Sequence, residues 1–323
     1  MSIQHPLPHG GAMEIVISSV FLLFAILAVI ARFYSRSLQR KPISVDDYLI
    51  IAGLVFTIAT VGVGYALILN GGVGMHMADA TTEQTVMALK LFVAAPLMWA
   101  TSTVLIKLSI LFFYISIFTM SNIRTAVYIL ITLVIALFTA VILESFLLCR
   151  PFAFTWDKTI PGGVCGSSTE AYLAIAIVNL VIDLAVVFLP MPILWRLQMP
   201  FAKKLAISAI LALGLLICGL TAARIKSVVE LDSLDFTYTV VPDLIFGALE
   251  VELGIVNACL PIMRPVGRKV FGSSSVFHQG WSKERKISKG SNDLRGSALI
   301  DTRKFNRMSN NSRPQDEVSP GKF

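Results

Sequence analysis

Several charged and polar residues occur in the middle of long apolar stretches of this sequence. Lys107 lies in one such stretch, Asn179 and Asp183 lie in a second, and Glu250 lies in a third. A charge at the centre of a membrane-spanning helix costs about 2.5–3.5 kcal/mol, so such groups normally face the bundle interior and find a partner. One lysine among these carboxylates therefore predicts an ion pair, either with Asp183 or with Glu250.

Helical spacing groups these residues on particular faces. Asn179 and Asp183 are four residues apart and share one face. Glu250 and Asn257 are seven apart and also share a face, whereas Glu252 points to the other side of its helix and needs another neighbour. The predicted core polar network consists of Lys107, Asn179, Asp183, Glu250, Glu252 and Asn257. It is either a structural ion pair that fixes packing, or a switch sensitive to a ligand or proton, since breaking such a pair repositions helices.

These residues need elements that cross a membrane, and the sequence provides seven apolar stretches. With 55% hydrophobic residues, 15% charged residues and a mean hydropathy of +0.76, the composition excludes a soluble domain. A transmembrane helix takes roughly 17–25 mostly apolar residues. We therefore predict an all-α membrane protein, a bundle of seven transmembrane helices. The predicted spans are residues 13–34, 45–69, 86–118, 124–148, 170–196, 204–228 and 240–263.

The loop charges predict the orientation of the bundle. Lys and Arg collect in short cytoplasmic loops, and they occur after the first, third and fifth spans, while residues 70–85 and 229–239 are acidic. This predicts an N-terminus outside and a C-terminus inside. Residues 1–12 are then a short extracellular segment, residues 13–264 the membrane domain and residues 265–323 a cytoplasmic tail.

The predicted tail carries most of the excess positive charge. From Arg264 onward there are 13 of the 27 Lys and Arg residues but only 5 of the 20 Asp and Glu residues. The tail is rich in Ser, Gly and Asn and has no sustained apolar period, which predicts disorder. Its basic residues either only anchor the orientation, or they contact anionic lipid at about 1 kcal/mol per residue. Cytoplasmic signalling proteins are the other partners expected there, and no nucleic acid is expected.

Two acids mark the start of the second predicted span. Ser44 is placed to cap this helix, with Asp46 and Asp47 in its first turn, where they meet the positive end of the helix dipole. Capping explains the pair without any catalytic role. An ionic lock between helix ends, with Arg32, Arg36 and Arg124 as candidate partners, is the alternative.

The predicted outward side has its own set of polar residues. Cys149 and Cys165 flank an outward loop on the oxidising side. We predict a disulfide between them, which for a loop of about 15 residues stabilises by roughly 3 kcal/mol; two free cysteines are the alternative. Lys90, Glu144 and Arg224 lie nearer the outer ends of their spans.

Spaced motifs along the chain suggest a family. They are Arg32-Phe33-Tyr34 followed by Asp46-Asp47, Gly72-Val73-Gly74-Met75-His76, Lys107 through Tyr114, Cys149-Arg150-Pro151 with Trp156 and Cys165, Asn179 with Asp183 and Pro190, Arg224, and Glu250 through Pro261. Over about residues 14–270 the chain resembles the fungal rhodopsin-like integral membrane family, which includes receptors related to the Pth-type pathogenicity proteins. The resemblance implies a seven-helix fold and receptor-like sensing.

The residues limit what that resemblance implies. Retinal proteins hold their chromophore through a lysine in the last helix, and residues 240–263 contain none, so we expect no retinal and no other cofactor. A transporter or channel for small solutes or ions is the alternative function. Catalysis at a metal is not expected, because the four histidines (His5, His9, His76 and His278) lie outside the predicted spans. We expect a multi-pass protein of the plasma membrane rather than of an internal membrane.

Overall fold

The structure is a computed structural model of the 323-residue chain. By internal contacts the chain divides into Met1–Val266 and Gly267–Phe323. The predicted tail, 265–323, lies outside the described residues, so its lipid and protein contacts stay predictions. The structure describes residues 9–40, 42–76, 81–117, 121–157, 159–191, 201–230 and 236–263.

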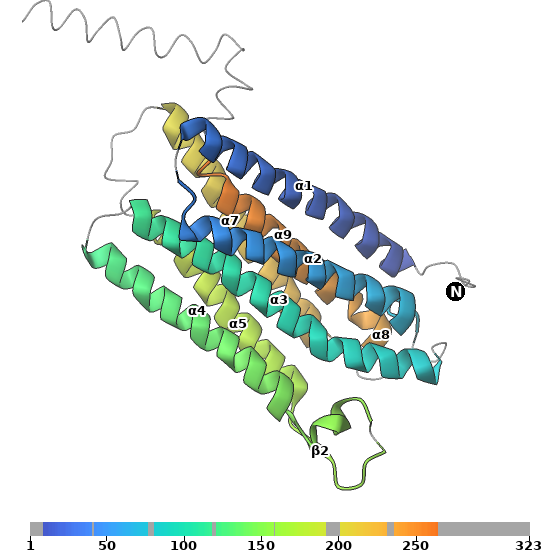
Figure 1. Cartoon of the computed structure of the whole chain (residues 1–323). Coiled ribbons are helices and arrows are strands. Elements are labelled where there is room, and N and C mark those ends of the chain that lie inside the picture. The colour runs from blue at the N-terminus through green and yellow to red at the C-terminus, as the bar shows by residue number, and fades with distance from the viewer. Residues whose placement is uncertain are drawn as a thin grey trace, which may run out of the picture. The chain divides into compact units, whose positions relative to one another are not determined.

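Long α-helices lying side by side make up nearly all of the described chain (Figure 1). Helices suit a membrane because each one pairs its own backbone polar groups. The long helices are α1 (His9–Gln39), α2 (Val45–Gly71), α3 (Thr82–Ile117), α4 (Ser121–Leu147), α5 (Ser168–Phe188), α7 (Phe201–Val229) and α9 (Val241–Cys259). The short elements are β1 (Cys149–Arg150), the 3-10 helix η2 (Phe152–Thr155), β2 (Val164–Cys165) and the single turn α8 (Phe236–Thr239).

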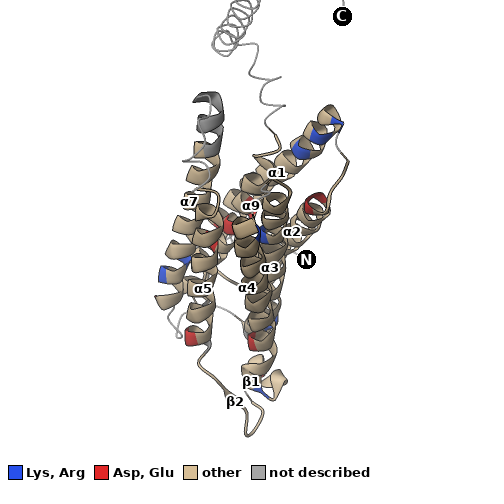
Figure 2. Cartoon of the chain, turned by 90° about the vertical axis from the view of Figure 1, so that its left-hand side faces the viewer, with Lys and Arg blue, Asp and Glu red and all other residues tan. Residues whose placement is uncertain are grey.

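Six of these helices, α1 to α5 and α7, are long and apolar enough to cross a membrane by length and composition. The helix α9 differs, because its 19 residues include Asp243, Glu250 and Glu252. Large apolar side chains such as Leu23 and Leu143 are exposed on the outside of the bundle. Figure 2 shows charged residues sparsely placed among uncharged ones. The chain is thus an all-α integral multi-pass membrane protein that contacts the lipid bilayer.

Two predicted spans differ from the observed helices by about five residues or more at one end. The helix α1 runs to Gln39, past the predicted end at residue 34, because its polar residues there find partners: Ser35 Oγ donates a hydrogen bond to the Ile262 carbonyl at 2.6 Å. The helix α5 ends at Phe188, short of the predicted residue 196. A turn follows it at Pro190, a residue that has no N–H to continue a helix. Residues 192–200 lie outside the described part of the chain.

The apolar core consists of separate clusters in which α3 packs against its neighbouring helices. One apolar cluster joins Val29 of α1, Ile50 of α2, Trp99 and Ile106 of α3, and Ile255 of α9. A second cluster packs α3 against α4 and α5. The pairs α5·α7 and α7·α9 also pack together, and α9 contacts α1 and α2. Because α9 has neighbours on several sides, its acidic residues face protein.

The loop between α4 and α5 contains the predicted disulfide. Cys149 of β1 and Cys165 of β2 are directly opposite each other in an antiparallel pair, with Cα atoms 4.1 Å apart, and their sulfurs are bonded. The prediction of this bridge is confirmed. The bridge ties the end of α4 to the approach to α5, on the side of the bundle where the larger cavity described below also lies.

Candidate functional site

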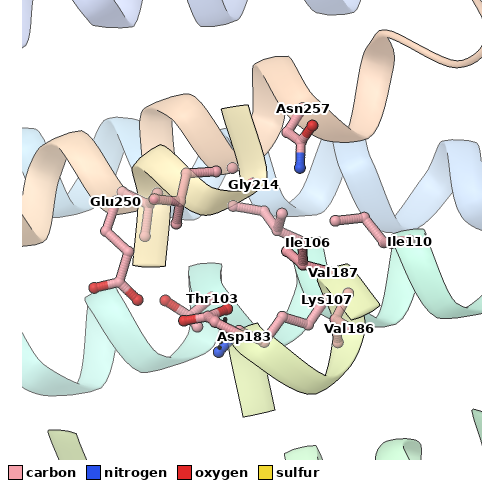
Figure 3. Close-up of a pocket in the computed structure, with 13 residues that line it drawn as sticks. Thr103, Ile106, Lys107, Ile110, Asp183, Val186, Val187, Gly214, Glu250 and Asn257 are labelled. Carbon is pink, nitrogen blue, oxygen red and sulfur yellow. Dashed lines mark ion pairs between the residues drawn. The ribbon is translucent and has the colours of Figure 1, made fainter. Parts of the chain in front are cut away.

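Three helices bring most of the core polar network together. Lys107 Nζ of α3 lies 3.0 Å from Asp183 Oδ1 of α5 and donates a hydrogen bond to Asn179 Oδ1 at 2.5 Å. Asn179 Nδ2 donates to Glu250 Oε1 of α9 at 2.8 Å and to Asp183 Oδ2 at 3.3 Å. The lysine therefore pairs directly with Asp183, and it is connected to Glu250 through Asn179. Figure 3 shows Lys107 and Asp183 converging from their two helices.

The network continues to a fourth helix through Arg224 of α7. Its Nη1 lies 3.6 Å from Glu250 Oε2, and its Nε donates to Asp243 Oδ1 at 2.9 Å. The guanidinium carbon also lies 4.1 Å from the centre of the Trp99 ring, a cation–π contact. Arg224 thus joins the network, although the sequence placed it only near an outer helix end. Asp243 was not predicted at all, but its spacing of seven residues from Glu250 puts both acids on one face of α9.

All members of this charge network are shielded from solvent. Lys107, Asn179, Asp183 and Glu250 are buried, and the side chains of Arg224 and Asp243 are only 13% and 18% exposed. Ion pairs in such surroundings are sensitive to the loss of one partner, which typically costs about 3–5 kcal/mol. We use the term charge network below for the connected residues Lys107, Asn179, Asp183, Glu250, Arg224 and Asp243.

Glu252 and Asn257 do not join the charge network among the described residues. Both carboxylate oxygens of Glu252 and the Oδ1 atom of Asn257 are buried and have no hydrogen-bond partner there. The ionisable neighbour of Glu252 is another acid, Glu14 of α1. Asn257 lines a small cavity of about 40 Å³ together with Lys107 and Glu250, and Figure 3 shows it apart from Glu250.

A larger cavity, of about 500 Å³, lies beside the disulfide loop. This volume is in the range of about 300–1,000 Å³ that ligand pockets have. Its walls come from α1, α2, α3, α4, α5, α7, α9 and the loop, and most are apolar. The polar lining includes Glu14, Trp99, Glu144, Tyr172, Arg224 and Asp243. We call it the outer cavity. Arg224 and Asp243 belong both to its wall and to the charge network. Of the three charges that the sequence predicts near the outer helix ends, Glu144 and Arg224 line this cavity, and Lys90 is exposed.

The acids at the start of α2 form a separate cluster with two arginines of α1. Arg32 lies 2.5 Å from Asp46 and 2.9 Å from Asp47, and Arg36 lies 2.7 Å from each of them. Asp47 also accepts a hydrogen bond from the Ser44 N–H at 3.1 Å. The structure therefore contains both sets of contacts that the sequence left open, capping and helix-end ion pairs. We call Arg32, Arg36, Asp46 and Asp47 the helix-end cluster.

The helix-end cluster reaches two further helices. Arg32 Nη1 donates to the Ala258 carbonyl near the end of α9 at 2.8 Å. Ser109 Oγ of α3 donates to the Asp46 carbonyl at 2.7 Å. Since Ser109 is two residues from Lys107, one short segment of α3 contacts both the charge network and the helix-end cluster.

This arrangement, apolar helices enclosing buried charges and a cavity, defines an integral membrane bundle with a polar core. Comparison with known sequences identifies its family. Residues 31–269 match the fungal rhodopsin domain, and the chain belongs to that family. The resemblance drawn from the spaced motifs is confirmed.

The sequence identity to individual relatives is low. The polyenoic acids biosynthesis gene cluster protein Ba17b of Metarhizium anisopliae is 28% identical over 275 residues, which are 81% of this chain and 75% of that protein. A SAT4 family membrane protein of Emericella nidulans is 32% identical over 211 residues, 64% of this chain and 53% of the relative. The receptor GIN3 of Arthrobotrys oligospora is 29% identical over 227 residues, 69% and 55% of the two chains. The chain thus spans about half the length of the last two. No solved structure matches it.

Proposed function

We propose that this protein is a receptor-like sensor of the plasma membrane, with seven spans, an outward N-terminus and a cytoplasmic C-terminus. A small ligand binds in the outer cavity, and the occupied cavity changes the charge network. The observation that carries this proposal is the position of Arg224, which lines the outer cavity and contacts Glu250 in the same network. The name of the relative GIN3, a receptor, agrees with the proposal.

The burial of acids on α9 supports a seventh span. Glu250 and Glu252 are buried against neighbouring helices, and ionisable residues inside membranes normally face the bundle interior in this way. The bridge between Cys149 and Cys165 supports the orientation, because disulfides persist on the oxidising side of a membrane. With this loop outside, alternation of the four preceding spans puts the N-terminus outside as well.

A continuous line of contacts supports signal transfer across the bundle. It runs from Arg224 through Glu250 and Asn179 to Lys107. From there α3 continues to Ser109, which contacts the helix-end cluster at the predicted cytoplasmic side. A ligand that changes the pairing of Arg224 then repositions α3 relative to α5 and α9, and the helix-end cluster moves with it.

The function proposed is non-enzymatic and needs no retinal. Helix α9 contains no lysine that could form a Schiff base. Cytoplasmic signalling proteins, bound through the basic tail, are the proposed partners, and anionic lipid is the proposed surface for that tail. The alternative, a transporter or channel, predicts ion or solute flux through the protein in the absence of any partner.

The coupling proposed can be tested with a fluorescent label on the cytoplasmic end of α3. Ile117 is exposed there, and the other cysteines are either buried or bridged, so Ile117→Cys accepts the label selectively. We expect Arg224→Gln to change the label's emission. The matched control is Lys226→Gln, which removes the same charge from an exposed position of the same helix. Equal emission in the two variants would refute the coupling.

A second measurement separates the receptor from the transporter. The purified protein is reconstituted in liposomes, and the flux of protons, sodium and potassium is followed against empty liposomes. We expect no added flux. Flux that the protein supports without partners would replace the receptor with the transporter. Capture of a G-protein subunit from fungal cytosol by the full chain, and its loss without residues 265–323, would support signalling through the tail.

A further inference from the structure

The outer cavity contains acids that have no basic partner. Its lining includes three acids, Glu14, Glu144 and Asp243, but only one base, Arg224. Arg224 is already paired with Asp243 at 2.9 Å and with Glu250 at 3.6 Å. No ion pair connects Glu14 or Glu144 to a base within the described ranges, and each has a buried oxygen without a hydrogen-bond partner. The cavity wall therefore contains two carboxyl groups, Glu14 and Glu144, for which the described residues provide no basic partner.

Glu14, on the α1 side of the cavity, is the most deeply buried of these acids. Glu14 is 1% exposed, and its Oε1 lies against Gly64 of α2, where an added Cβ would come within 3.0 Å. Glu252 of α9, a neighbour of Glu14, is fully buried and has no hydrogen-bond partner on either oxygen in the described part of the chain. Buried acids without a partner are rare and call for an explanation.

A second observation in the same cavity also points to a ligand. Trp99 of α3 lines it and is 6% exposed, and its Nε1–H has no acceptor among the described residues. A buried indole N–H normally finds an acceptor. An occupant of the cavity would supply that acceptor, in addition to a positive charge for Glu14. The apolar wall, which includes Phe92, Pro96 and Leu244, fits an apolar body between the two.

We infer that the outer cavity binds a small organic amine with an apolar body and a hydrogen-bond-accepting oxygen. The ammonium group pairs with Glu14, and Trp99 donates a hydrogen bond to the oxygen. This inference rests on the proposed function, since the amine is the ligand class of the same sensor. If the cavity instead prefers a neutral ligand, with its acids protonated, that result would replace the inference of an amine.

The test uses a matched pair of probes with the full chain in nanodiscs. The cationic probe is N,N-dimethyl-3-phenoxypropylamine, and the neutral isostere is 4-methylpentyl phenyl ether, in which a carbon replaces the nitrogen. Their apparent Kd values are obtained from the rise of the Tm with concentration. We expect the amine to bind at least about ten-fold more tightly than the ether, because hydrogen bonds to charged groups are the strong ones. The anionic probe 4-phenoxybutanoate should bind most weakly.

Two variants assign the selectivity to Glu14. In Glu14→Gln the preference for the amine over the ether should fall to near unity, while Glu170→Gln, a change of the same charge at an exposed site outside the cavity, should keep it. Equal binding of amine and ether to the unmodified chain, preference for the anion, or selectivity that survives Glu14→Gln would each overturn the inference.

A measurement on the unmodified chain covers the case in which Glu14→Gln does not fold. A lipid-soluble carbodiimide modifies buried carboxyl groups, and peptide mapping by mass spectrometry locates the adduct. The amine should protect Glu14 and the ether should not; equal modification of Glu14 with either probe contradicts the inference. The label on Ile117 requires no ligand, so a failure of the amine test alone leaves the proposed coupling standing, and a failure of the coupling leaves amine binding measurable.

Discussion

Removing the positive charge from Lys107 is the most direct test of the charge network. In Lys107→Met, Asp183 loses a partner at 3.0 Å and Asn179 Oδ1 loses a donor at 2.5 Å. Breaking a buried ion pair from one side typically costs about 3–5 kcal/mol, since a charge is left without compensation. We expect a loss of this size in the free energy of unfolding, measured as folded yield and thermal midpoint by fluorescence-detected size exclusion.

The double variant shows how much of that loss belongs to the pair. In Lys107→Met with Asp183→Asn the uncompensated charge is gone, but Asn179 Oδ1 still lacks its donor, which costs about 1–3 kcal/mol. Rescue should therefore be partial, with a coupling energy of about 1–3 kcal/mol. In the cycle of Lys107→Met with Glu250→Gln the coupling should be smaller, because Asn179 stands between these two residues.

An exposed pair on the same protein provides the control cycle. Lys226 and Glu230 lie 3.6 Å apart, and their side chains are 76% and 64% exposed. Such a pair is worth roughly 0–1 kcal/mol, so Lys226→Met with Glu230→Gln should show almost no coupling. Strictly additive losses in the Lys107–Asp183 cycle, or stronger coupling to Glu250 than to Asp183, would refute the contacts described here.

Three further predictions concern the two faces of the bundle. Intact-mass analysis after alkylation should find Cys149 and Cys165 unlabelled until reductant is added, and Cys149→Ser should cost roughly 3 kcal/mol; labelling without reductant would contradict the bridge. Asn310, in the only Asn-x-Ser/Thr sequon of the chain, should carry no glycan in the native host, since a glycan there would reverse the orientation. Arg32→Met should lower the thermal midpoint more than Arg36→Met, because Arg32 is buried and also donates to a carbonyl of α9; equal losses would mean that this contact adds nothing.

The elements and the central ion pair follow from the sequence for clear reasons. The start of α2 agrees with its predicted start, residue 45, because Ser44 and the acids after it form a local signal. Lys107 is the single cation among the predicted central residues, so its choice of partner was narrow. Helical spacing alone then put Asn179 beside Asp183, where it also reaches Glu250.

The rest of the site depends on which helices are neighbours, and spacing along one helix does not carry that information. The sequence predicts Arg224 near the outer end of its helix, but the direction of its side chain depends on α9 and on Trp99, which lies 125 residues earlier in the chain. Glu14 sits at the beginning of an apolar span, where an acid is commonly a solvated helix-end residue. Only the packing of α1 against α2 and α9 makes it a buried wall of the outer cavity.

The charge network is difficult to explain by stability alone. Replacing a buried ion pair by well-packed apolar residues is often neutral or stabilising by about 1–4 kcal/mol. A bundle that needed only packing at this position would therefore be served by apolar side chains. The network instead connects the wall of the outer cavity to α3, and through Ser109 to the helix-end cluster. An apolar replacement of Lys107 and Asp183 together should then fold but lose the response of the Ile117 label to Arg224→Gln. Retention of that response would assign the pair to packing and separate it from sensing.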